Sequence, residues 1–191
     1  MNLLHRIRNL FGRGRITLVN DSGTIQVVQV KTTDSDVSDE RIRMAEFGFT
    51  SYPPDGSEAL LLHIAGNRYD GAVVATNHQP SRPTGLQSGE SMLYSQDGKH
   101  VYLTADGGIV INANSQPVTV NGATTVTINA ATKVRMVTPR LECTGDIVDN
   151  CDTTGRSMVA DRQIYDGHNH AVTGVQPGSG TVTSNAPSQP E

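Results

Sequence analysis

Short stretches of alternating apolar and polar residues run through most of the chain, as in β-strands that bury one face. Before residue 95, turns rich in Gly, Pro, Asn and Asp separate these stretches, and an acidic loop is expected at 34–40. The expected strands are 15–19, 24–30, 41–49, 58–64 and 72–76. Five or six short antiparallel strands in about 80 residues are typical of a small closed barrel. The pattern therefore predicts an OB-fold over residues 15–95.

Residues 1–14 form a separate N-terminal arm ahead of this barrel. The first twelve residues have the period of an amphipathic helix, with one apolar face made of Leu3, Leu4, Ile7, Leu10 and Phe11. Gly12 and Gly14 are expected to end the helix. Two roles stay open, a helix packed on its own domain and an arm that docks on a partner. A membrane-surface helix is less favoured.

From about residue 90 the pattern becomes a repeat. A strand and turn at 91–99 lead into apolar triplets that begin 8, 9, 8 and 8 residues apart, at 101–103, 109–111, 118–120, 126–128 and 134–136. A fixed short period indicates a repeat architecture. In a monomeric β-helix these units would complete fewer than two turns, which is too little core. Three chains would instead close a prism and pair their strand edges. An intertwined homotrimeric β-helix is therefore predicted over residues 96–164.

Composition and charge agree with a narrow all-β molecule. The chain has three Phe, five Tyr and no Trp, which suits a thin interior filled by aliphatic side chains. Cys143 and Cys151 make no disulfide framework and are expected to be buried there as small apolar residues. A net charge of −4 does not favour nucleic acid as a partner. No export signal is apparent, so assembly in a cytoplasm is expected.

The sequence Tyr-Asp-Gly-His-Asn-His at 165–170 carries the most specific chemistry in the chain. In extended backbone His168 and His170 point to one side and can share a metal ion, although two imidazoles complete no coordination sphere. Three chains on one axis would supply six imidazoles, the ligand count of one octahedral ion in a closed, structural site. Nitrogen ligands suit Fe, Ni, Co, Cu or Zn, of which six-coordination disfavours zinc, and iron is a plausible choice among the abundant metals. Asp166 is expected to orient one imidazole as an acceptor. The alternative is a pair of exposed histidines in a loop.

Other chemistry is weakly supported. His63 and His78 have no neighbours at ligand spacing, and His63 is expected to be a hydrogen-bonded structural residue. The chain has no G-x-S-x-G, H-E-x-x-H, P-loop or G-x-G-x-x-G motif, so it is predicted not to be an enzyme. The alternative left open is a cell-surface glycan-binding or glycan-cleaving β-helix with paired carboxylates. A third is an oligonucleotide-binding OB protein.

The chain resembles the central baseplate spikes of contractile-tailed phages, of the kind found in phage Mu and Mu-like prophages. The resemblance covers essentially the whole chain, and its most specific part is 165–170 followed by Gly-Val-Gln-Pro-Gly-Ser-Gly at 174–180. It implies an OB-fold, a trimeric β-helix and a tip at 165–191 with a capping tail. In that tip His168 and His170 of each chain would hold one iron ion per trimer on the threefold axis. Some relatives carry further axial ions such as Ca or Cl, which this sequence does not place.

The resemblance also implies a mechanical role. The chain would be a structural tail spike in the virion baseplate, assembled in the host cytoplasm, that perforates the host outer membrane when the sheath contracts. The arm and the OB domain would face the baseplate hub and tail-tube proteins. The tip would meet the host outer membrane.

Overall fold

The computed structural model describes residues 3–173 and 181–186, and the chain divides into two compact units, Met1–Ala123 and Thr124–Glu191. Strands outnumber helices in the described residues, which confirms the predicted all-β class. The first unit begins with a short helix and then five strands: α1 (Leu3–Arg8), β1 (Phe11–Asn20), β2 (Val27–Thr33), β3 (Asp36–Arg43), β4 (Glu58–His63) and β5 (Gly71–Asn77).

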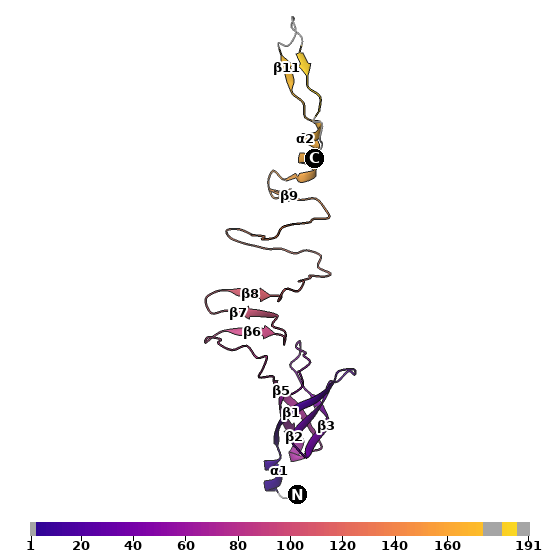
Figure 1. The fold of residues 1–191 in the computed structure, drawn as a ribbon, viewed down its shortest axis with the longest axis vertical. Helices are drawn as coiled ribbons and strands as arrows, with labels where there is room; N and C mark the ends of the chain where they lie inside the picture. Colours follow the sequence, from indigo (N-terminus) through magenta and orange to yellow (C-terminus); the bar gives the residue numbers. More distant parts are fainter. Residues whose placement is uncertain (1–2, 174–180, 187–191) are drawn as a thin grey trace. The chain divides into compact units, whose positions relative to one another are not determined.

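These five strands form a closed barrel in the order β1-β2-β3-β5-β4 (Figure 1). The closure depends on β1, which pairs with β4 along its first half and with β2 along its second half. A register shift between Ile16 and Leu18 marks the place where β1 changes partners. The closed barrel that the sequence predicts is thereby confirmed.

Small and β-branched residues dominate the barrel core, which consists of Ile16, Val19, Val28, Val30, Ala59, Leu61 and Val73. In β4 the alternation is clear, because Ala59 and Leu61 are buried while Leu60 and Leu62 lie outside. Each fully buried aliphatic side chain contributes about 1.5–3 kcal/mol. The period-2 pattern in the sequence therefore reflects which side chains of each strand point into this core.

His63 completes the inward face of β4 and is only 4% exposed. Burial lowers the pKa of this imidazole, and the positive charges of Arg68 and Arg41 lower it further. Its buried Nδ1 has no hydrogen-bond partner among the described residues, so the expectation of a hydrogen-bonded histidine is not met at this atom. The neutral imidazole is the form that suits the folded barrel.

We expect acidification to destabilise the barrel through His63. Because its folded-state pKa lies below the ordinary value of 6.5, the unfolded chain binds more protons as the pH falls through 6.5. The free energy of unfolding then decreases. Hydrogen exchange of the β4 amides between about pH 7 and pH 5, corrected for intrinsic rates, measures this loss. His63→Gln should flatten the pH dependence, and constant protection in the wild type would contradict the prediction.

The predicted acidic loop at 34–40 is wrong, because most of it is β3. A tight turn joins β2 to β3, and the first pair after it is Thr33 with Asp36. The inward-facing residue at the centre of β3 is Ser38, which is 7% exposed. A buried serine among acidic residues has no hydrophobic signal, so strand pairing alone reveals this element.

The predicted strand at 41–49 is also wrong beyond Arg43. The chain turns at Gly48, where φ is +88°, and the N–H of Phe49 donates to the carbonyl of Glu46 at 3.0 Å. A strand over this whole range would bury part of its apolar side chains, but Ile42, Met44 and Phe47 are exposed. They belong to the outer face of β3 and the loop that follows it.

The arm helix α1 is shorter than the predicted 1–12. Gly12 and Gly14 lie inside β1 and do not end the helix. A side chain at Gly14 would come within 2.6 Å of the Lys31 carbonyl oxygen, so glycine there permits the close approach of β1 to β2. Gly66, at the end of the 3₁₀ turn η1 (Ile64–Gly66), lies against the backbone of Arg6. The helix therefore packs on its own barrel.

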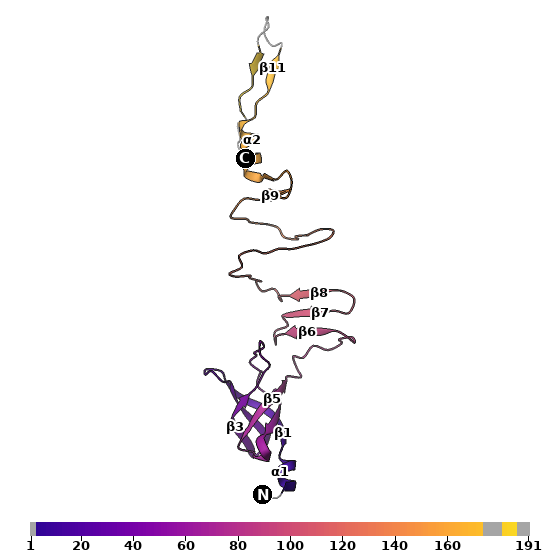
Figure 2. The same ribbon diagram turned by 180° about the vertical axis from the view of Figure 1, so that it is seen from behind.

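A three-stranded antiparallel sheet follows the barrel in the first unit, made of β6 (Ser91–Tyr94), β7 (His100–Leu103) and β8 (Ile109–Asn112) (Figure 2). The Glu90 carboxylate holds its start, accepting hydrogen bonds from the Tyr102 hydroxyl and from the N–H groups of Gln87 and Ala105. These bonds, led by that of Tyr102, lower the pKa of Glu90. The first repeat units thus pair within one chain.

Residues 113–147, all of which the structure describes, contain no strand. The apolar residues of the later triplets are 54–71% exposed in the single chain: Val118, Val120, Val126, Ile128, Val134 and Met136. Cys143 and Cys151 are exposed as well. One chain does not bury these side chains, so the predicted β-helix and the burial of both cysteines in a trimer stay predictions.

The second unit contains a helix that the sequence did not predict. The elements of this unit, in chain order, are the short strands β9 (Val148–Asp149) and β10 (Arg156–Ser157), the helix α2 (Met158–Gly167), and the strands β11 (Ala171–Thr173) and β12 (Thr181–Thr183). The hydroxyl of Ser157 caps α2 by accepting from the N–H of Ala160 at 3.1 Å, and Asp161 lies in the first turn. Neither α1 nor α2 is long and apolar enough to cross a membrane, and no other described helix is.

Candidate functional site

The two histidines singled out by the sequence lie just after α2. His168 caps the helix with backbone angles of −73° and 148°, so the chain becomes extended there. Its Nδ1 lies 2.5 Å from the carbonyl oxygen of Tyr165. A carbonyl only accepts hydrogen bonds, so Nδ1 carries the hydrogen, and in the neutral ring the lone pair is then on Nε2. In this tautomer Nε2 is the ring nitrogen of His168 that could ligate a metal ion.

His170 lies at the base of the β11–β12 hairpin. Its N–H donates to the hydroxyl of Ser184 at 2.8 Å, and the N–H of Ser184 donates back to the His170 carbonyl at 2.8 Å. These two bonds extend the ladder that pairs Ala171 with Thr183. The backbone of His170 is therefore held by the strand pair that follows it in the sequence, whereas α2 precedes the histidine pair.

The structure brings the two imidazole rings together. Their centroids are 5.1 Å apart, and the ring planes are nearly perpendicular at 88°. Bonds of about 2.1 Å from one ion to two imidazole nitrogens at 90–110° would separate the ring centroids by about 4.6–5.2 Å. The centroid separation is compatible with two adjacent positions on a single ion, and it is equally that of an edge-to-face contact between the two rings.

One chain does not complete a metal site in its described part. No group of three or more His, Cys, Asp or Glu residues is close enough there to hold an ion. The predicted iron and the role of Asp166 stay predictions. The motif at 174–180 and the end of the capping tail, from 187 to 191, lie outside the described residues.

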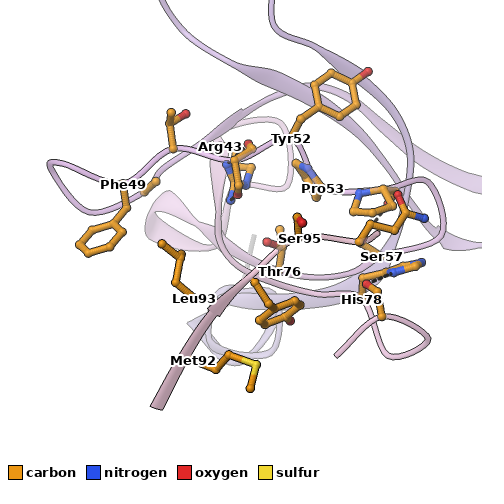
Figure 3. Close-up of a pocket in the computed structure, with 17 residues that line it drawn as sticks. Arg43, Phe49, Tyr52, Pro53, Ser57, Thr76, His78, Met92, Leu93 and Ser95 are labelled. Carbon is orange, nitrogen blue, oxygen red and sulfur yellow. Dashed lines mark hydrogen bonds between the residues drawn. The ribbon is translucent and has the colours of Figure 1, made fainter. Parts of the chain in front are cut away.

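A second candidate site lies in the first unit. It is a hollow of about 480 Å³ between the barrel and β6. Figure 3 shows Phe49, Leu93 and Met92 along one side of it, with Ser57 and His78 on the other. The Nδ1 of His78 lies 2.6 Å from the hydroxyl of Ser81, so this histidine is engaged locally. Among the described residues no Asp or Glu lines the hollow, so they do not supply it with the paired carboxylates that the glycan-cleaving alternative requires.

Three groups around the histidine pair were not predicted from the sequence: α2, the Tyr165 carbonyl and Ser184. Ser157 before a helix-compatible run was a usable signal for α2. No local signal existed for Ser184, because 14 residues separate it from His170 and only the hairpin brings them together.

The barrel matches a known family. Residues 13–80 fit the family model described as Bacteriophage Mu Gp45, N-terminal. The Baseplate puncturing device gp45 of Escherichia phage Mu is 31% identical over 145 residues, which are 76% of this chain and 68% of that protein. The chain belongs to the phage Mu gp45 family. The Mu-like prophage FluMu protein gp45 of Haemophilus influenzae is 28% identical over 164 residues, 84% of this chain and 85% of that protein. The resemblance to Mu-like spikes is thereby confirmed.

Proposed function

We propose that this gp45-family chain is the puncturing spike of a contractile phage baseplate and perforates the host outer membrane when the sheath contracts. The main support for this proposal is that the chain belongs to a family whose phage Mu member is named a baseplate puncturing device. Such a protein is located in the virion tail and binds other baseplate proteins. The barrel and the arm would contact the hub and the tube.

A homotrimer is the second part of the proposal. Residues 113–147 have an alternating pattern but neither strand partners nor a covered apolar face in one chain. Two further copies would supply both, by pairing backbone groups and enclosing the apolar side chains in a prism. The exposed triplets support this assembly, because a stretch with this much uncovered aliphatic surface favours association.

An iron-bound tip is the third part. His168 and His170 of three chains would hold one ion, which would cross-link the chain ends. The separation of the rings and the free lone pair on Nε2 of His168 fit that ligand set. The proposal assigns no residue to Ca or Cl.

The mechanism proposed is mechanical. Contraction supplies the force, and the trimer transmits it through backbone hydrogen bonds shared among chains. The ion would hold together the chain ends, which are otherwise the weakest part of a fibre. No catalytic step and no nucleic acid are involved.

Periplasmic access tests the proposed function. Cells with a periplasmic β-lactamase are exposed to wild-type particles, to particles lacking the chain and to particles with a sheath that cannot contract. Only contraction with the chain present should admit nitrocefin, seen as its hydrolysis. Equal access with particles lacking the chain would overturn the proposal. Release of sugar from lipopolysaccharide by the purified chain would favour the glycan-cleaving alternative.

A further inference from the structure

We propose that Ser184 and the last turn of α2 are positioning groups that hold the histidine pair ready for its ion. This inference rests on the proposed metal-bound tip and adds residues to it that the histidine motif does not contain. It assigns Nε2 of His168 as a ligand atom. It also makes the pairing of β11 with β12 a support of the site.

The first support comes from α2. The Nδ1–H of His168 donates to the Tyr165 carbonyl at 2.5 Å. The imidazole of His168 also lies beside the phenol ring of Tyr165, with ring centroids 5.3 Å apart and ring planes at 49°. A hydrogen bond and a ring contact on the same residue restrict both the tautomer and the rotation of the imidazole. The Ser157 cap at the other end of α2 stabilises the helix that presents this carbonyl.

The second support comes from the hairpin. Ser184 binds both the N–H and the carbonyl of His170, each at 2.8 Å. Three residue pairs of β11 and β12 continue from this point. His170 is thus fixed by a segment 14 residues away, and Ser184 is partly buried in this arrangement. The segment from His168 to His170 is held at both ends by different elements.

Such restraint matters for an ion held by imidazoles. Ligands that are already oriented lose less conformational freedom on binding. Loss of a group that supports a metal ligand typically weakens metal binding 10–100-fold. The hydroxyl of Ser184 acts only on the backbone of His170, so we expect an effect at the low end of this range, about 10-fold.

Metal retention tests the role of Ser184 in the full-length trimer. Iron content is measured by elemental analysis, and iron loss is followed after addition of a strong chelator. Ser184→Ala should bind iron but lose it about 10-fold faster than the wild type. Ser184→Thr keeps the hydroxyl and should restore slow loss. Ser81→Ala is the matched control, because it removes a serine hydroxyl that contacts a histidine in the first unit, outside the proposed site, and it should behave like the wild type.

The outcomes separate the two proposals. A wild-type trimer without metal would refute the metal-bound tip. A wild type that holds iron, with Ser184→Ala losing it at the wild-type rate, would overturn only the positioning role. A second measurement does not need the metal: ¹⁵N spectra of histidine-labelled, metal-depleted protein should show the Nδ1–H tautomer of His168. The Nε2–H tautomer would overturn the inference even if Ser184→Ala failed to fold.

Discussion

Replacing His168 and His170 together by alanine is expected to abolish metal binding and to loosen the tip. The wild-type trimer should contain about one ion per three chains, and the double variant should contain none. Binding of a structural metal contributes on the order of 10 kcal/mol where folding depends on it. Elemental analysis measures the metal, and calorimetry with and without chelator measures the stability that depends on it.

The control for this pair is His78→Ala, which removes an imidazole outside the proposed site. It should leave the metal content and the effect of chelator unchanged, since His78 contacts Ser81 in the first unit. Hydrogen exchange at β11 and β12 adds local information, because amides beside His170 should lose protection in the double variant. Undiminished metal in the double variant, or a wild type that does not respond to chelator, would contradict the prediction.

Ile128→Asp is expected to prevent trimer formation. Ile128 is 66% exposed in the single chain, and alternation places it on the same face as Val126. In the proposed prism three copies of this side chain meet in the interior. Three carboxylates in that place would each lose hydration and repel one another, at several kcal/mol per charge. Sedimentation should show a shift from trimer to monomer or aggregate.

Thr127→Asp introduces the same charge on the opposite face of the same segment. It should leave the trimer intact, because an outward carboxylate remains hydrated. Comparing the two variants separates the effect of burying the new carboxylate from the effect of adding a negative charge to the segment. A stable Ile128→Asp trimer, or equal loss of assembly in both variants, would exclude the proposed inward direction of the apolar triplet.

The alternating pattern alone determined much of the fold. The strand predicted at the start of 91–99 is β6. The strand predicted at 58–64 is one residue longer than β4, and that at 72–76 is one residue shorter than β5 at each end. Such strands carry their own evidence, because inward and outward residues alternate and turn residues flank them. The histidine pair was equally visible, since two ligands one residue apart are a local feature.

Contacts between distant residues decided the rest. β3 is a strand because β2 pairs with it, although its inward residue is Ser38. Gly14 serves the approach of a neighbouring strand and does not end a helix.

The surroundings of the histidine pair depend on such contacts as well. A serine far along the chain holds His170, and the Tyr165 carbonyl in the last turn of α2 orients His168. These contacts join residues at no regular spacing in the sequence, so no pattern of residue types predicts them. The histidines were evident from the sequence, but the groups that orient them were determined only by the folded chain.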